Sequence, residues 1–188
     1  MVKHLKDTIR KQIIAKRNLL SNEEIGNLSA SISERLINYP EFKKAKVVAF
    51  YIPKGNEVDT RKMIEHAITE GKEVLIPVTD HKITFYKFKS FNDLIKGSFG
   101  VLEPESRETP SKEPDVVIVP GVTFGLCMHR LGYGKGYYDL YLAGSSAYRI
   151  GICFNFQVVE KLPTHEHDQK MDCMITESRV IYPSKQNQ

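Results

Sequence analysis

The chain has 188 residues, of which 41% are hydrophobic and 27% are charged, with a formal net charge of +4. These values are typical of globular proteins and predict a single domain, 1–188, with a sizeable core. No apolar run of about 18 residues is present, which excludes a conventional transmembrane helix, and the N-terminus lacks the apolar segment of a signal peptide. The three cysteines are widely spaced and form no CxxC motif, so we expect a cytoplasmic protein.

The first segment is predicted to form a basic N-terminal helix over residues 2–20. Its apolar positions recur at helical spacing, and its first twenty residues hold six basic residues against the single acid Asp7. The apolar set is Val2, Leu5, Ile9, Ile13 and Ile14, and the basic set is Lys3, Lys6, Arg10, Lys11, Lys16 and Arg17. Such a helix could bind an anionic ligand, but we expect most of these charges to form a solvated face. Because no nucleic-acid-binding motif accompanies them, we expect a monomer with neither a nucleic-acid nor a membrane partner.

The rest of the chain alternates between helical and strand-like patterns. Ser21 and Glu24 have the spacing of a capping box and begin a second helix, which Pro40 closes. Strands are predicted at 47–51, 73–77, 83–88, 116–120 and 148–154, and a final strand or hairpin is predicted after residue 173. Helices are predicted at 60–70 and 137–144. Within 91–114 we expect a short helix followed by a long loop. This alternation predicts an α/β fold with an open, mainly parallel sheet flanked by helices, followed by a frayed tail at 184–188.

The segment RLGYGKGYYD, Arg130 to Asp139, is the most informative part of the sequence. Its alternating glycines allow the backbone to approach a ligand, Arg130 and Lys135 can neutralise phosphate, and Asp139 is a hard oxygen ligand for Mg²⁺. It follows a predicted strand and precedes a predicted helix, a favourable setting for an anion. The spacing matches neither a P-loop nor GxGxxG, and a ligand-free turn is the alternative. The interleaved charged and aromatic residues favour a nucleotide site.

Further candidate residues lie in two other loops. Glu57 follows the strand predicted at 47–51 and could bind a polar group of a ligand, although it could equally favour the start of the next helix. Asp168 is a candidate second oxygen ligand for Mg²⁺. His165 and His167 form an HxH pattern without further zinc ligands at the usual spacing, so we expect them to be solvated. Cys153 and Cys173 lie in apolar runs and are expected in the core.

Taken together, these segments resemble the 5-formyltetrahydrofolate cyclo-ligase family, also called methenyltetrahydrofolate synthetase. The resemblance spans nearly the whole chain. It is carried by KDTIR (Lys6–Arg10) with Arg17, by YIPKGNEVDT (51–60), by VPGVTF and the glycine-rich segment after it, and by Gly151–Glu177. It implies an open α/β sheet and a ligase of one-carbon metabolism. The implied reaction converts 5-formyltetrahydrofolate and ATP to 5,10-methenyltetrahydrofolate, ADP and phosphate.

The resemblance also implies roles for individual residues. Arg130 and Lys135 would be the catalytic pair, and Asp139 and Asp168 would hold Mg²⁺. ATP would be bound by Lys6, Arg10, Arg130, Leu131, Gly132, Tyr133, Gly134, Lys135, Gly136, Tyr137 and Tyr138, and the folate by Ile52, Glu57, Tyr133, Gly134, Lys135, Gly136 and Tyr137. The alternatives are another ATP-dependent phosphotransferase or ligase acting on a different small anion, and a binding module without turnover.

One departure from the family pattern precedes Arg130. The family usually has Phe-Asp-x-x-Gly-x-Arg, whereas this chain has Gly125 in place of the Asp and Met128 in place of the Gly. We therefore expect the turn before Arg130 to take a different shape or to relax.

Overall fold

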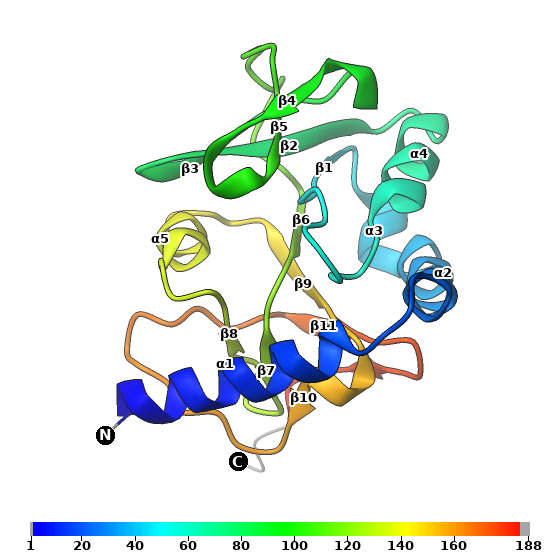
Figure 1. The fold of residues 1–188 in the computed structure, drawn as a ribbon. Helices are drawn as coiled ribbons and strands as arrows, with labels where there is room; N and C mark the ends of the chain where they lie inside the picture. The colour runs from blue at the N-terminus through cyan, green and yellow to red at the C-terminus, as the bar shows by residue number, and fades with distance from the viewer. Residues whose placement is uncertain (1, 185–188) are drawn as a thin grey trace.

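A computed structural model describes residues 2–184 of the chain, and its centre is a seven-stranded sheet (Figure 1). The strand order is β12-β11-β9-β6-β1-β2-β3. The five inner strands are parallel, and β12 and β3 are antiparallel edges. The bounds are β1 Val47–Ala49, β2 Glu73–Asp80, β3 Lys82–Lys87, β6 Val116–Val119, β9 Tyr148–Ile152, β11 Cys173–Ile175 and β12 Val180–Ile181. The predicted open, mainly parallel α/β fold is confirmed, and so is the closing hairpin after residue 173.

Five α-helices accompany the sheet: α1 Val2–Asn18, α2 Asn22–Ile37, α3 Pro40–Lys44, α4 Arg61–Thr69 and α5 Tyr137–Ala143. The predicted capping box is present, because the Glu24 amide donates to the Ser21 hydroxyl and the Glu24 carboxylate accepts from the Ser21 amide. Pro40 does not simply end α2 but begins α3, where its missing N–H costs nothing. None of these helices, which all lie within residues 2–184, is long and apolar enough to cross a membrane.

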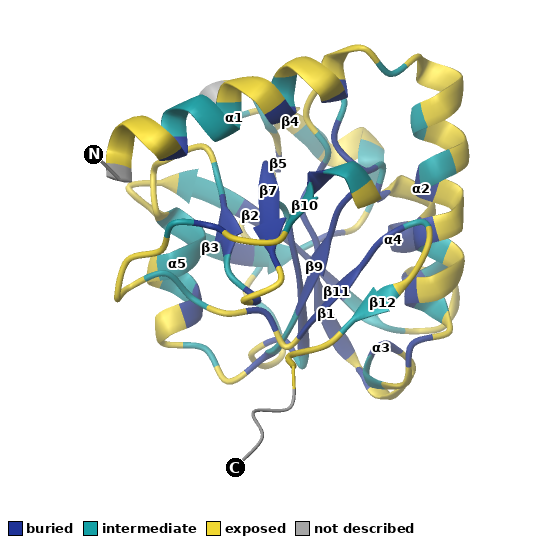
Figure 2. Ribbon diagram, turned by 90° about the horizontal axis from the view of Figure 1, so that it is seen from below, coloured by how far each residue is buried: buried dark blue, intermediate teal, exposed yellow. Residues whose placement is uncertain are grey.

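The inner strands are buried along much of their length (Figure 2), and their successive residues enter opposite cores. One core joins Val48, Ile118 and Ile150 to side chains of α2, α3 and α4. The other joins Val117 and Val119 to α5 and to a small second sheet. Cys153 and Cys173 are buried, as predicted. This two-sided burial explains why the inner strands read as continuous apolar runs.

Short strands outside the main sheet were not predicted. A second sheet has the order β10-β7-β8, with bounds Val158–Val159, Thr123–Gly125 and Arg130–Leu131. Within 91–114, the predicted short helix is a single 3₁₀ turn at Phe91–Asp93, and the expected loop contains a hairpin of β4, Leu94–Lys96, and β5, Leu102–Pro104. Strands of two or three residues are too short to display a period-two pattern, which is why the sequence did not reveal them. Of the predicted frayed tail, residues 185–188 lie outside the described part of the chain.

The connectivity of the sheet positions the candidate site. The chain order runs outward in both directions from the neighbouring strands β1 and β6, which are far apart in sequence. Ligands of open α/β proteins bind at such a reversal, beyond the carboxyl ends of the strands. The Glu57 loop follows β1, and the β7–β8 hairpin with the glycine-rich loop follows β6. Helix α1 lies against β7, beside the same edge (Figure 1).

Candidate active site

Helix α1 buries a face that is partly basic. Lys6, Arg10, Ile13 and Arg17 are spaced by four, three and four residues and so share one stripe of the helix. Lys6 is 7% exposed and Arg17 is 4% exposed, whereas Leu5 of the predicted apolar stripe is 50% exposed. The expected solvated face is therefore correct for the exposed Lys3, Lys11 and Lys16 and wrong for Lys6 and Arg17. Burial of these cations follows from the polar partners that the loops offer them.

The glycine-rich loop joins β8 to α5 and is tied to α1. Gly134 and Gly136 have φ of 98° and 69°, a left-handed conformation that favours glycine. The Arg10 guanidinium donates from Nε to the Gly132 carbonyl at 2.8 Å. A Cβ on Gly134 would lie 3.4 Å from Arg10 Nη2, so the loop backbone and this guanidinium are in close contact. The loop residues 133–136 remain exposed, as a ligand-binding loop requires.

Arg130 and Asp139 form a partly buried ion pair at the base of this loop. Arg130 is 6% exposed and donates from Nη1 to Asp139 Oδ1 at 2.7 Å. The same oxygen accepts from the Gln169 amide at 3.1 Å. The Arg130 guanidinium also lies 5.6 Å from the centre of the Tyr138 ring. Within residues 2–184, the buried Nε of Arg130 and hydroxyl of Tyr138 have no hydrogen-bond partner, so both could bind a ligand.

A second ion pair joins α1 to the loop before β11. Lys6 Nζ donates to Asp168 Oδ2 at 2.8 Å, and the His165 amide donates to the same oxygen at 2.8 Å. Burial alone would raise the pKa of Asp168, but these two bonds outweigh it and lower the pKa below its ordinary value of 3.8. Because the main-chain N–H of Gln169 donates to Asp139, the backbone directly after Asp168 lies against the Asp139 carboxylate.

The lowered pKa of Asp168 predicts an acid-sensitive contribution to stability. A carboxyl whose pKa is lower in the folded state stabilises the fold above its unfolded pKa and loses that contribution as pH falls through the folded pKa. We therefore expect Asp168→Asn to lower the free energy of unfolding at pH 7, and the deficit to shrink below pH 3.8. Urea unfolding of both proteins across this range measures it. A deficit that is constant with pH would contradict the stabilising role of the pair.

Glu57 lies in the loop after β1 and contacts the glycine-rich loop. Although it is only 8% exposed, both of its oxygens have donors: the Tyr133 hydroxyl donates to Oε1 at 2.8 Å and the Lys54 amide donates to Oε2 at 3.0 Å. Burial, and then the nearby Glu57 charge, raise the pKa of Tyr133 to about 12. The loop predicted to bind the folate and the glycine-rich loop, which is predicted to bind both substrates, therefore meet at one hydrogen bond.

The turn before Arg130 keeps the conformation that a glycine would favour. Met128 has φ of 68°, and its amide donates to the Gly125 carbonyl at 2.8 Å. A left-handed non-glycine residue costs about 1–3 kcal/mol, and here the Met128 side chain is buried in the second core. At Gly125 a Cβ would lie 2.8 Å from Cys127 Sγ and 2.9 Å from Leu162 Cβ. This turn therefore leaves no room for a side chain at Gly125 and holds Met128 in a strained left-handed conformation.

The structure does not place every predicted residue in an open position. Ile52 and Leu131 are 2% and 3% exposed, and Ile52 packs in the first core, whereas Lys135 is exposed. The predicted histidines His165 and His167 are exposed, and the described residues contain no group of three or more His, Cys, Asp or Glu that could hold a metal ion. The contacts that sequence reasoning missed include those from Arg17 to Tyr133 and from the main-chain N–H of Gln169 to Asp139. The spacing of Arg17 from Arg10 was the available signal for the first.

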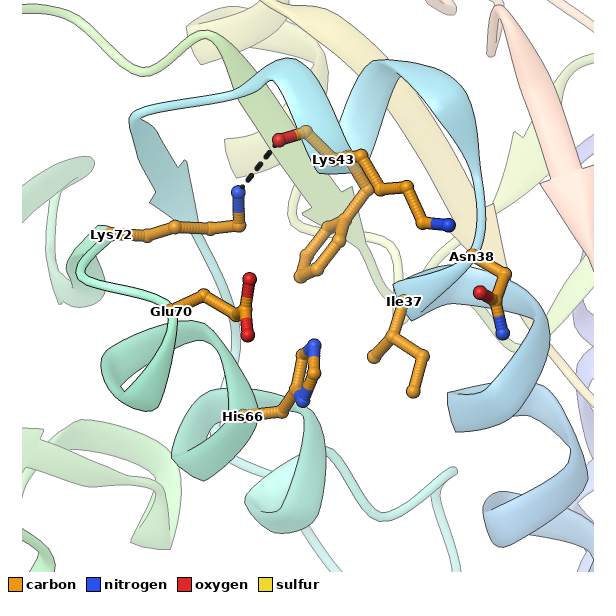
Figure 3. A pocket seen from close by; sticks show the side chains of 7 residues that line it. Ile37, Asn38, Lys43, His66, Glu70 and Lys72 are labelled. Carbon is orange, nitrogen blue, oxygen red and sulfur yellow. Dashed lines mark hydrogen bonds between the residues drawn. The ribbon is translucent and has the colours of Figure 1, made fainter.

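A separate surface hollow of about 360 Å³ lies away from these residues (Figure 3). It is lined by Ile37, Asn38, Phe42, Lys43, His66, Glu70 and Lys72. Lys72 donates to the Lys43 carbonyl at 3.0 Å and directly precedes β2. The hollow therefore lies near the amino ends of the strands, opposite the edge at which ligands of such sheets bind.

Comparisons with known proteins match this architecture. Residues 2–177 match the model of the 5-formyltetrahydrofolate cyclo-ligase family. A probable 5-formyltetrahydrofolate cyclo-ligase of Schizosaccharomyces pombe is 34% identical over 94% of this chain and 97% of its own, and the Escherichia coli K12 cyclo-ligase is 30% identical over 88% and 96%. The solved 5,10-methenyltetrahydrofolate synthetase of Aquifex aeolicus superposes with a TM-score of 0.86 at 38% identity, covering 98% of this chain and 95% of its own. The solved 5,10-methenyltetrahydrofolate synthetase of Mycoplasma pneumoniae superposes with a TM-score of 0.73 at 29% identity, covering 92% of this chain and 98% of its own.

Proposed function

The chain belongs to the 5-formyltetrahydrofolate cyclo-ligase family, and from this premise we propose how its residues carry out the reaction. The protein is a ligase that converts 5-formyltetrahydrofolate to 5,10-methenyltetrahydrofolate, with ATP converted to ADP and phosphate. The contact that best supports a single site for both substrates is the bond from Tyr133 to Glu57. It joins the glycine-rich loop, proposed to bind ATP and the folate, to the Glu57 loop, proposed to bind the folate.

The proposed chemistry uses position and charge rather than a covalent enzyme intermediate. The formyl oxygen attacks the γ-phosphorus and ADP leaves. The N10 amine then attacks the formyl carbon and closes the ring, and phosphate departs from that carbon as the N10 proton is lost to solvent or to the leaving phosphate. Such a phosphoryl transfer requires alignment of the reacting oxygen with the phosphorus and neutralisation of developing charge. Arg130 and Lys135 are proposed to neutralise that charge, which is the role of preorganised donors in general.

ATP is proposed to contact α1 and the glycine-rich loop together. Lys6 and Arg10 already bind the loops that surround this position, through Asp168 and Gly132. The segment 130–138 adds a guanidinium, a lysine and a loop in which Gly134 and Gly136 adopt left-handed backbone. The folate is proposed to contact Glu57, Ile52 and the tyrosines Tyr133 and Tyr137, whose rings can stack on a flat pterin.

Asp139 and Asp168 fit a Mg²⁺ ion that accompanies ATP. Both bonds given above for Asp139 end on Oδ1 and both given for Asp168 end on Oδ2, so the second oxygen of each carboxylate is the one we propose as the metal ligand. Mg²⁺ in such sites takes one or two carboxylates and completes its shell with phosphate and water. When bound, it would neutralise phosphate charge. We also propose a cytoplasmic monomer, a view supported by the free thiols of all three cysteines.

Asp139→Asn is expected to weaken the response to Mg²⁺. The substitution removes one of the two carboxylate charges, so the Mg²⁺ concentration that gives half-maximal activity should rise about tenfold, a typical loss for a weakened metal site. A Mg²⁺ titration at fixed ATP measures it, with Asp93→Asn as the control because Asp93 is exposed and remote in the fold. If both variants titrate like the wild type, Asp139 does not hold the metal.

The proposed substrate is tested by the dependence of ADP formation on the folate. We expect purified protein with ATP and Mg²⁺ to release ADP only when 5-formyltetrahydrofolate is added. ADP release that is independent of the folate, or that requires a different small anion, would favour the alternative ATP-dependent enzyme.

A further inference from the structure

Arg17, in the last turn of α1, carries a buried charge that is not directly neutralised. Its side chain is 4% exposed, and it has no ion pair within 4.0 Å among the described residues. Its Nη2 donates to the Tyr133 hydroxyl at 2.6 Å, whereas its buried Nε has no hydrogen-bond partner in the same part of the chain. Burial of an arginine without a carboxylate partner is costly, so packing alone is a poor explanation for this residue.

The Tyr133 hydroxyl connects Arg17 to Glu57 through two hydrogen bonds. A guanidinium can only donate, so the phenol oxygen must accept from Arg17, and its single proton is then directed to Glu57 Oε1 at 2.8 Å. The Lys54 amide holds the other Glu57 oxygen, and Asn56 of the same loop donates from Nδ2 to the Arg17 carbonyl at 3.2 Å. The three side chains thus form a directed chain from α1 through the glycine-rich loop to the loop after β1.

We propose that Arg17 is a positioning residue for the folate site: it fixes the Tyr133 hydroxyl and thereby orients the Glu57 carboxylate. This inference rests on the proposed function, which places the folate at Glu57. It also gives α1 a second role, since the same helical stripe contacts the glycine-rich loop through Arg10 and is linked through Arg17 and Tyr133 to the Glu57 carboxylate. Loss of the guanidinium should therefore affect folate affinity more than ATP affinity or turnover.

The test is a double-mutant cycle on the binding of 5-formyltetrahydrofolate, measured by calorimetry, together with KM for both substrates. Arg17→Met and Tyr133→Phe are each expected to raise the Kd for the folate about tenfold, the usual size for a lost hydrogen bond to a charged group. Both substitutions break the same series of hydrogen bonds, so their effects should not add. The Kd of the double variant for the folate should therefore also be raised only about tenfold. Lys16→Met is the matched control, since Lys16 precedes Arg17, is exposed, and loses the same charge.

Arg17→Lys provides a second variant if the buried methionine prevents folding. A lysine can still donate to the phenol, so we expect folate affinity closer to wild type in Arg17→Lys. In the Arg17 and Lys16 variants we expect the KM for ATP to stay within a few-fold of wild type. The inference would be overturned if Arg17→Met and Lys16→Met bound the folate with equal affinity, or if the two single effects multiplied in the double variant. Turnover by the wild-type protein would still support the proposed function in that case. A wild-type protein that neither binds nor converts the folate would overturn both.

Discussion

Arg130→Ala is expected to lower kcat by roughly 10²-fold or more, the usual loss when a preorganised electrostatic donor is removed. Arg130 is nearly buried and held by Asp139 at 2.7 Å, so its guanidinium is in place before substrate binds. Its Nε has no partner within residues 2–184 and remains available for phosphate oxygens. Steady-state kinetics at saturating ATP and folate measure the effect.

Two further variants show whether a loss of turnover in Arg130→Ala comes from the missing charge or from a destabilised fold. Arg130→Lys keeps a cation but loses the planar guanidinium, whose Nη1 donates to Asp139, so we expect an intermediate loss of turnover. Arg61→Ala removes an exposed arginine paired with Asp59 and should leave turnover unchanged. Thermal unfolding of each variant shows how far the Asp139 ion pair supports the fold. If Arg130→Ala retains turnover within a few-fold of wild type while folded, the assignment of Arg130 is wrong.

Phe124→Ala is expected to destabilise the protein by about 3–5 kcal/mol, because the ring is fully buried between the two sheets. Phe124 lies in β7, where it pairs with Arg130 of β8. Its ring fills the space above Gly121 and Gly151, since a Cβ on either glycine would lie 2.7 Å or 2.5 Å from it. Urea unfolding measures the loss, and Phe156→Ala, at a half-buried ring, should cost less.

A second substitution tests whether this contact is the cause. Gly151→Ala places a methyl group in the space that the Phe124 ring occupies. In the wild-type background it should lower the free energy of unfolding by about 1–3 kcal/mol. In the Phe124→Ala background the ring is gone, so the same substitution should cost much less. Equal costs in both backgrounds would show that Phe124 does not limit the space at Gly151.

The fold was largely predictable from the sequence because its inner strands and its helices carry long, consistent patterns. The continuous apolar runs of β1 and β6 reflect burial on both faces, and the capping box at Ser21 and the glycine at 144 mark helix ends. The short strands β4, β5, β7 and β8 were not predicted, because their two or three residues depend on pairing partners rather than on local pattern.

The sequence indicates which loops form the candidate site, but it does not indicate which side chains in them contact one another. The composition of RLGYGKGYYD indicated a ligand-binding loop, but nothing local indicates that Lys6 pairs with Asp168 or that Tyr133 donates to Glu57. These contacts join residues more than seventy positions apart and arise from the sheet order. Arg17 was read as one charge among several on a solvated face. Its burial follows from the tertiary contact with Tyr133, which the helix pattern alone does not specify.

The most direct test of the function is the near-ultraviolet absorbance of the methenyl product. We expect purified protein, MgATP and 5-formyltetrahydrofolate to give an absorbance increase that requires all three components and is matched by ADP formed in equal amount. No increase, from a folded protein that still binds ATP, would contradict the cyclo-ligase activity and leave the nucleotide loop acting on a different substrate.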